Sequence, residues 1–269
     1  MDGREECEHR RSLGRRRCRA HEGFARELVA SQPDVIVTTS TPTTAAVSQK
    51  TATTPIVFTV VSDPIGEGFV RSLPRPGGNI TGFVNFEPTL AGKWIGFLKE
   101  IDRRVVRVAG LYNPDAAPNG SSFFSCAFEA AARNMAMAAL LKPVRSDADI
   151  EAAISATAAE PGAGLVFMAD SLVHRKAVIE QAAKHRVPAV YPFRTAPADG
   201  GLMSYGPEVG ELFRQVAPYV DRILKGTHPS QLPVQTPTRF ELVINLRTAK
   251  ALDLHVPPAL LTRADDLVE

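Results

Sequence analysis

Long apolar runs are missing from this chain of 269 residues. It has no stretch of about 18 uninterrupted apolar residues of the kind that spans a bilayer. Charge of one sign is scarce too, because the formal net charge is only +2, too small to indicate nucleic acid as the main partner. Cys7, Cys18 and Cys126 are too few for a disulfide framework, and their odd number leaves at least one unpaired. The totals therefore indicate a globular protein held together by an ordinary apolar core.

Motifs of common enzymes are also absent. The sequence contains no G-x-G-x-x-G and no G-x-x-x-x-G-K-S/T, and the glycines at 162 and 164 precede a strand rather than follow one. Ser204 resembles the serine of a nucleophile elbow, but one residue too many separates it from Gly201. None of the six histidines directly follows a predicted strand, so we interpret them as surface residues. The sequence thus predicts no enzyme, no cofactor and no metal site.

Residues 1–22 differ in composition from the rest of the chain. They contain seven arginines and almost no aliphatic residues, which predicts a disordered or loosely attached segment. It is not a signal peptide, because it lacks an apolar central region. A zinc site built from Cys7, His9, Cys18 and His21 is disfavoured, since their spacing matches no common finger pattern. A basic nucleic-acid-binding arm remains an alternative.

From Phe24 onward, apolar strands alternate with amphipathic helices. Phe24, Leu28 and Val29 have helical spacing ahead of Pro33. A short buried strand is predicted at 34–37, a hydroxyl-rich loop at 38–41, and a helix that begins with Pro42. Further strands are predicted at 55–61, 107–112, 140–144, 164–168, 188–191, 200–205 and 240–244, and further helices at 66–73, 89–101, 123–137, 147–159, 173–185, 207–225 and 248–252, with residues 74–83 as an irregular connection.

This alternation predicts the α/β class, with mostly parallel sheets flanked by helices on both faces. The number of strands and helices suits two such sheets better than one. Trp94 falls within the apolar stripe of its predicted helix, which favours a place in the core over a contact with a ligand.

Polar side chains collect where the predicted strands end. In open α/β sheets ligands sit at the carboxyl ends of the strands, and a helix N-terminus offers N–H groups to an anion such as a carboxylate. Hydroxyl, amide and carboxylate groups can hold a small polar ligand without transforming it. The candidate ligand-binding residues are Thr39, Ser40, Thr41, Thr43, Ser62, Asp63, Asn113, Ser121, Asp170, Tyr191 and Tyr205.

Two interpretations remain open for several of these residues. Asp63 and Asp170 are candidates to bind a ligand ammonium, but each can equally cap the helix that follows it. The hydroxyls between Thr39 and Thr43 can likewise act only as caps, and Asn113 before Pro114 can simply shape a turn.

Taken in order, the motifs resemble a known family. The series PDVIVTTSTPTTAAV, TPIVFTVVSDPIGEGFV, PGGNITGF, RVAGLYNP, VPAVYPFR, GGLMSYGP and PVQTPTRFELVINLRTAKALDL is similar to the ABC transporter substrate-binding proteins of the tryptophan-binding-protein-like family, over residues 24–269. The resemblance implies the type I periplasmic binding protein fold, in which two α/β lobes close over a ligand in the cleft between them. It implies a solute receptor for an amino acid or a similar small polar molecule, with ABC permease subunits as partners and no nucleic acid.

The same resemblance implies where the chain passes between lobes. One lobe is expected to contain residues 23–82 and 206–233, and the other residues 83–205 and 234–269. A ligand-sensing domain of a regulator on the same fold is the alternative function, and an α/β enzyme is a more remote one.

The start of the chain departs from the family pattern. Members usually begin with a secretion signal or lipoprotein anchor, then a strand, a helix and a second strand, where this chain has its Arg-rich segment. The first lobe is therefore expected to lack an edge of its sheet and part of one cleft wall, as after a wrongly assigned or frameshifted start. The resemblance implies a periplasmic or membrane-anchored extracytoplasmic protein, whereas Met1 as the true start predicts a cytoplasmic one.

Overall fold

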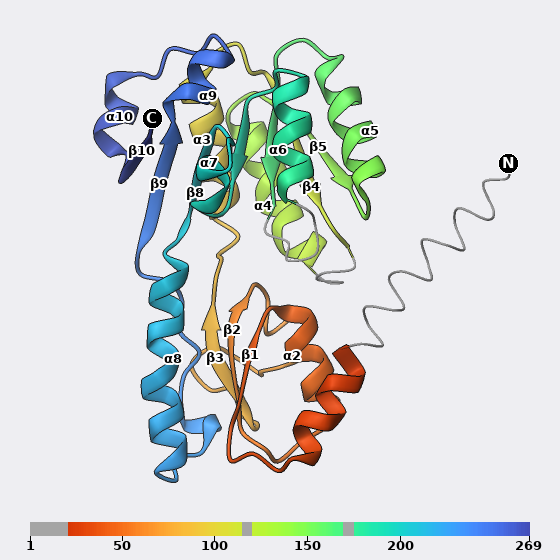
Figure 1. Ribbon diagram of the computed structural model, residues 1–269, viewed down its shortest axis with the longest axis vertical. Helices are drawn as coiled ribbons and strands as arrows, with labels where there is room; N and C mark the ends of the chain where they lie inside the picture. Colours follow the sequence, from red (N-terminus) through yellow and green to blue (C-terminus); the bar gives the residue numbers. More distant parts are fainter. Residues whose placement is uncertain (1–20, 115–119, 169–174) are drawn as a thin grey trace, which may run out of the picture. The chain divides into compact units, whose positions relative to one another are not determined.

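The structure is a computed structural model that describes residues 21–114, 120–168 and 175–269, apart from the side chains of 120–123 and 175 (Figure 1). The chain divides into two compact units. The first unit contains the described residues up to Asn85 together with Gly210–Thr236, and the second contains those of Phe86–Val209 and Pro237–Glu269. Each of the three crossings lies three or four residues beyond the position that the family resemblance implies. The predictions for residues 1–20, including the zinc alternative, lie outside the described residues.

The first unit is built on a parallel three-stranded sheet. Its strands β1 (Ile36–Thr39), β2 (Ile56–Val61) and β3 (Ile80–Val84) are ordered β1-β2-β3. One face packs on α2 (Thr41–Ser48) and on the helix of residues 21–30, with the aromatic ring of Phe58 fully buried. The other face is covered by α8 (Val209–Leu224), followed by the short helix η1 (Pro229–Gln231). Both faces of the sheet are therefore covered by helices, as the sequence predicts.

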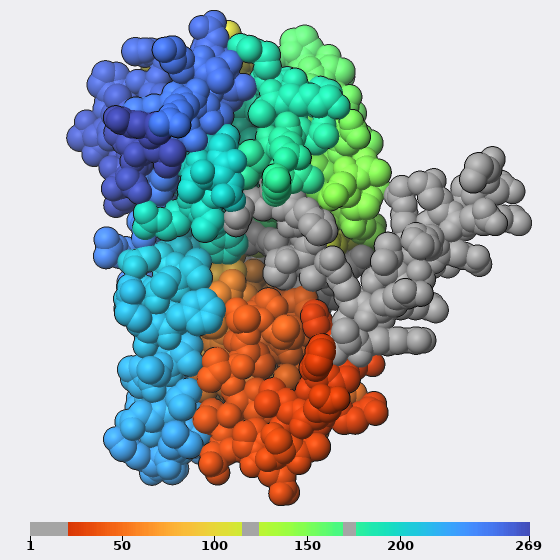
Figure 2. All heavy atoms as spheres, in the orientation of Figure 1, coloured from red at the N-terminus to blue at the C-terminus, as the bar shows by residue number. Residues whose placement is uncertain are grey.

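Spacing along α8 explains how it covers its sheet. Leu212, Val216, Tyr219 and Ile223 recur at helical intervals and are buried against β2 and β3. The outer side of the helix lies at the surface, drawn in light blue in Figure 2, where Phe213 is 47% exposed.

Three sequence-based expectations for the first unit are wrong. The first strand is Ile36–Thr39 rather than residues 34–37, and Val37 is 47% exposed because β1 is an edge strand. Residues 66–73 form turns instead of a helix, because Gly68 has φ 74° and Asp63 accepts a hydrogen bond from the Gly66 N–H. Within the expected irregular connection, Ile80–Val84 forms β3.

Gly82 explains why β3 can pair closely with β2. Its φ is 154°, and a Cβ atom at this position would lie 2.1 Å from the backbone oxygen of Phe58. Only glycine accommodates this approach of one strand to the next.

The second unit contains a seven-stranded sheet ordered β10-β9-β8-β7-β6-β4-β5, in which only the β8–β9 pair is antiparallel. The mostly parallel α/β class is thus confirmed. The strands are β4 (Arg107–Tyr112), β5 (Ala138–Pro143), β6 (Ala163–Phe167), β7 (Ala189–Tyr191), β8 (Met203–Pro207), β9 (Phe240–Asn245) and β10 (Asp266–Val268), and the helices are α3 (Leu90–Ile101), α4 (Gly120–Asn134), α5 (Asp147–Ala158), α6 (Arg175–Lys184), α7 (Thr195–Ala198), α9 (Leu246–Ala251) and α10 (Pro258–Arg263).

Alternation along the strands divides this core into two layers. On β4, Val108 joins the layer beneath α3 and α4, while Ala109 and Leu111 join the layer beneath α5 and α6. Trp94 is fully buried in the first of these layers, which confirms its predicted place in the core. Among the helices of the described ranges, none is both long and apolar enough to cross a bilayer.

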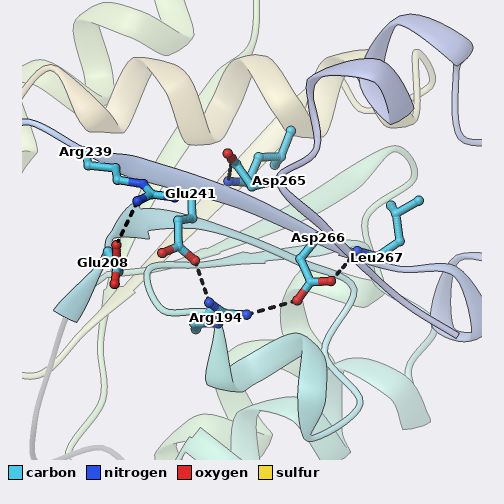
Figure 3. A network of polar contacts seen from close by, with 8 residues as sticks. Arg194, Glu208, Arg239, Glu241, Asp265, Asp266 and Leu267 are labelled. Carbon is cyan, nitrogen blue, oxygen red and sulfur yellow. Dashed lines mark hydrogen bonds and ion pairs between the residues drawn. The ribbon is translucent and has the colours of Figure 1, made fainter. Parts of the chain in front are cut away.

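Ion pairs fasten the C-terminal strand to this sheet (Figure 3). Arg194 contacts Glu241 of β9 and Asp266 of β10, each at 2.9 Å. Asp265 accepts a hydrogen bond of 2.8 Å from the N–H of Leu242. The sequence analysis predicted neither β10 nor α7, because both elements are short and are held by these tertiary contacts.

Candidate functional site

The β1–α2 turn gathers four of the candidate residues. Thr39 ends β1, Ser40 precedes α2, and Thr41 and Thr43 lie in its first turn. The Thr43 hydroxyl donates to the carbonyl oxygens of Thr39 and Ser40 and shares a hydrogen bond of 3.2 Å with the Ser40 hydroxyl. These hydroxyls therefore brace the turn by bonding to carbonyl oxygens and to one another, and not to helix N–H groups as the capping interpretation expects.

Ser40 leaves the start of α2 without a side-chain cap. It has φ 77° and ψ 154°, and its hydroxyl accepts no hydrogen bond from the helix backbone. The first N–H groups of any helix also lack partners within the helix. Backbone N–H donors at the N-terminus of α2 are consequently left without the usual side-chain acceptor. The positive end of the helix dipole lies at the same place.

Strained backbone occurs near the carboxyl ends of both β1 and its neighbour β2. Ser40 and Val60 have φ values of 77° and 58°, and Val60 lies where the pairing of β2 with β3 shifts register. A β-branched residue with positive φ is a conformational outlier, and such strain is concentrated at functional sites. Val60 was not among the predicted candidates, because its backbone strain depends on the register of the folded sheet.

Ser62 and Asp63 follow β2 and are both half-buried. The Asp63 Oδ1 accepts a hydrogen bond of 2.8 Å from the N–H of Gly66. A Cβ atom on Gly66 would lie 2.1 Å from the Asp63 Oδ2, so the carboxylate folds closely over that glycine. Asp63 thus caps a turn rather than a helix, and one of its oxygens is already committed.

Two buried polar atoms of the first unit were not found by sequence reasoning. The Thr59 Oγ1 and the Asn85 Oδ1 have no hydrogen-bond partner among the described residues, and the two residues are 0% and 3% exposed. Thr59 pairs in register with Thr39, and the N–H of Asn85 donates to the oxygen of Val61. Both residues therefore lie at the same strand ends as the predicted candidates, and a buried polar atom without a partner calls for an explanation.

Strand register brings two candidates of the second unit to the carboxyl ends of neighbouring parallel strands. Leu111 of β4 pairs with Phe167 of β6, and Val166 pairs with Val190 of β7. Asn113 directly follows β4 and Tyr191 ends β7, so both lie at the carboxyl ends of parallel strands in the same sheet. Asp170 falls outside the described residues, as does the side chain of Ser121.

Packing limits what the two candidate tyrosines can offer. Tyr191 is 1% exposed, its ring packs against Phe167, and burial raises the pKa of its hydroxyl above the usual range. Its register partner Ser204 is fully buried, and the Ser204 Oγ has no partner among the described residues. Tyr191 therefore belongs to the buried core beside the strand ends.

Tyr205 lies within β8 rather than at a strand end. Its ring stacks on Phe240 and contacts Phe97, at centroid distances of 5.8 Å and 5.0 Å. Burial and the nearby Asp265 raise the pKa of its hydroxyl.

Comparison with known proteins gives this fold a family. A model of ABC transporter substrate binding proteins matches residues 18–268. The tyrosine-binding protein of Clostridioides difficile is 24% identical over 234 residues, which cover 87% of this chain and 67% of that protein.

Solved structures agree with the family match. A conserved domain protein from Vibrio cholerae is 30% identical with a TM-score of 0.86, covering 93% of this chain and 83% of that one. A protein of Streptococcus pneumoniae solved in complex with L-Trp is 22% identical with a TM-score of 0.84, covering 93% and 86% of the two chains. The second likeness supports the fold alone.

Proposed function

The chain belongs to the family of ABC transporter substrate-binding proteins, and from that premise we propose that its ligand is an amino acid or a similar small zwitterion. The similarity to a tyrosine-binding protein supports this ligand class. We expect the protein to act outside the cytoplasm and to deliver the solute to the permease subunits of an importer.

The uncapped N-terminus of α2 is the observation that carries this proposal. Ser40 provides no side-chain cap, so the backbone N–H groups at the start of α2, among which Pro42 supplies none, can bind a ligand carboxylate. The Ser40 hydroxyl lies at the same turn and can add a hydrogen bond, whereas the Thr43 hydroxyl already donates to backbone carbonyl oxygens. A carboxylate at this position would also gain from the positive end of the helix dipole.

A ligand ammonium requires an acidic partner. Asp63 follows β2, the register neighbour of β1, and its Oδ2 is not used in the hydrogen bond with Gly66. We therefore propose Asp63 as the acceptor from the first unit. Asp170, predicted to follow β6, stays a candidate from the second.

The proposed role is binding without chemical change. The candidate side chains are hydroxyls, an amide and carboxylates, which form hydrogen bonds and ion pairs with a ligand. In this mechanism, the ligand stabilises whichever conformation of the protein binds it more tightly, by its differential affinity for that conformation.

Thermal-shift measurements on the full chain test this function. At a concentration of about 100 times its Kd, a bound amino acid stabilises the folded protein by about 2.7 kcal/mol, which raises the Tm by several degrees. We expect at least one of the common L-amino acids to produce this shift.

Asp63→Asn should weaken the response roughly tenfold, because it removes the charge that pairs with the ammonium. Asp34→Asn is the matched control, since Asp34 is an exposed residue of the same unit. A panel with no stabilising amino acid would contradict the ligand class, and an unchanged response in Asp63→Asn would contradict the role of Asp63.

A further inference from the structure

A depression in the first unit is lined by none of the candidate residues above. It has a volume of about 670 Å³ and is lined by Arg71, Ser72, Pro74, Arg75, Gly77, Ser230 and Gln231. These residues come from the β2–β3 connection and from η1. We call it the arginine pocket.

Two guanidinium groups are available at this pocket. Neither Arg71 nor Arg75 has an ion pair or a side-chain hydrogen bond to another residue in the described part of the chain. Some other exposed cations do have such partners; Lys225, for example, pairs with Asp221 at 2.8 Å. Two cations that line one depression without a carboxylate create a local positive potential that favours an anion.

Backbone contacts hold the loop that carries both arginines. The N–H of Arg71 donates to the oxygen of Pro76 at 2.9 Å, and the N–H of Val234 donates to the oxygen of Leu73 at 2.7 Å. The Ser72 Oγ accepts from the N–H of Arg75 and donates to its carbonyl oxygen, each at 3.2 Å. The origins of the two side chains are thus fixed relative to each other, which lowers the entropy lost when both bind one ligand.

Gly77 fixes the course of the Arg71 side chain. Its φ is 81°, and a Cβ atom there would lie 2.9 Å from the Arg71 Cδ. The aliphatic part of Arg71 therefore passes directly over this glycine, and any larger residue would displace it.

Neutral polar groups form the opposite wall. The Ser230 Oγ shares a hydrogen bond of 2.8 Å with the His228 Nδ1, and the exposed Gln231 contributes an amide. Among the described residues, no carboxylate lines the depression. The wall can donate hydrogen bonds to an anion without repelling it.

We propose that the arginine pocket binds an oxyanion of the phosphate class. Guanidinium groups present several N–H donors in a planar arrangement that matches the oxygens of a phosphate, and a charged hydrogen bond to each oxygen is stronger than a neutral one. The phosphate group belongs either to a dissolved compound or to a phospholipid headgroup. Because this pocket shares no residue with the proposed amino acid site, the two proposals stand or fall separately.

Titration of the full chain with inorganic phosphate, at constant ionic strength, tests the pocket. We expect saturable binding, followed by calorimetry, that Arg71→Gln and Arg75→Gln each weaken roughly tenfold, since each removes a charged hydrogen-bond partner. Arg26→Gln is the matched control, because Arg26 is an exposed arginine on the helix of residues 21–30 of the same unit and should leave binding unchanged.

Gly77→Ala tests the geometry without changing the charge. It should weaken phosphate binding severalfold by displacing Arg71, and circular dichroism would establish that the variant is folded. Absence of saturable binding, or equal binding by the parent and both arginine variants, would overturn the proposal.

Vesicles distinguish the two sources of the phosphate group. Sedimentation with phosphatidylglycerol vesicles but not with phosphatidylcholine vesicles, lost in Arg71→Gln, would assign the pocket to an anionic headgroup. Phosphate binding without sedimentation would assign it to a dissolved compound, and both results support an oxyanion site.

Discussion

The two sheets of this protein both have helices on their two faces, but they differ in extent, with three strands in the first unit and seven in the second. The seven-stranded sheet of the second unit has apolar layers beneath α3 and α4 on one face and beneath α5 and α6 on the other. The three-stranded sheet of the first unit ends at β1, where Val37 is 47% exposed and no described strand pairs with the outer edge. The larger sheet also exposes an apolar side chain at an edge, Leu140 of β5 at 57%. On the helix that precedes β1, Phe24 is 69% and Leu28 is 42% exposed.

This difference indicates that the first unit is the less stable one. A sheet of three strands buries less apolar area than a sheet of seven, and edge strands expose backbone groups and side chains to other chains. Regions with fewer buried contacts open at lower free energy than the global unfolding reaction. Three pairs of variants test this comparison, in order of decreasing expected effect.

Removal of a buried aromatic ring should separate the two units most clearly. Phe58 of β2 and Phe128 of α4 are both fully buried, so Phe58→Ala and Phe128→Ala should each lose about 3–5 kcal/mol. In Phe58→Ala we expect hydrogen exchange to become fast throughout β1, β2 and β3, while β4 and β6 remain protected. Phe128→Ala should leave more residual protection in its own unit.

Hydrogen exchange followed by mass spectrometry measures both responses. Equal loss of protection in the two units of Phe58→Ala would show that they unfold as one and would break the comparison.

Removal of Arg194 should weaken only the second unit. Arg194→Met leaves Glu241, whose side chain is 8% exposed, without its cation, while the guanidinium itself is 55% exposed. We expect a loss of about 1–3 kcal/mol, because an uncompensated carboxylate is costly but solvent screens this pair in part. Exchange of β10 amides should increase, with the first unit unchanged.

Arg239→Met serves as the control for Arg194→Met. Arg239 contacts Glu208 at 3.4 Å and is 70% exposed, so its loss should change the urea midpoint little. Equal effects of the two variants would show that the position of Arg194 between two strands has no special importance.

Two valines in register provide the smallest and most local test. Val37 pairs with Val57, yet the first is 47% exposed and the second is fully buried. Val57→Thr should lose about 1–2 kcal/mol, because it buries a hydroxyl, whereas Val37→Thr should stay within about 0.5 kcal/mol of the parent. A similar loss for both in urea unfolding would show that the outer face of β1 is covered in solution.

Strands with buried apolar runs were predictable from the sequence. Arg107–Tyr112 was predicted and is found as β4, because the run is buried on both faces and ends before Pro114. Ile80–Val84 was missed, because glycines precede it and Gly82 interrupts it. This segment becomes a strand because Gly82 packs closely against the backbone of Phe58, and the sequence around Gly82 does not reveal that contact.

The candidate site was predictable only in part. The hydroxyls from Thr39 to Thr43 are adjacent in sequence, so their gathering at one turn follows from local pattern. The strain at Ser40 and Val60, and the unpartnered buried hydroxyl of Thr59, arise from strand register and packing. These features belong to the tertiary structure and have no signature in the order of the residues.

Trp94 makes the two units optically distinguishable. It is the only tryptophan of the chain, it is fully buried in the second unit, and its indole N–H donates to the Tyr205 carbonyl oxygen at 2.7 Å. Phe86 and Phe124 surround its ring, with centroid distances of 5.9 Å and 5.8 Å. Indole emission therefore reports the integrity of the second unit, and a transition that leaves this emission unchanged while amides exchange belongs to the first.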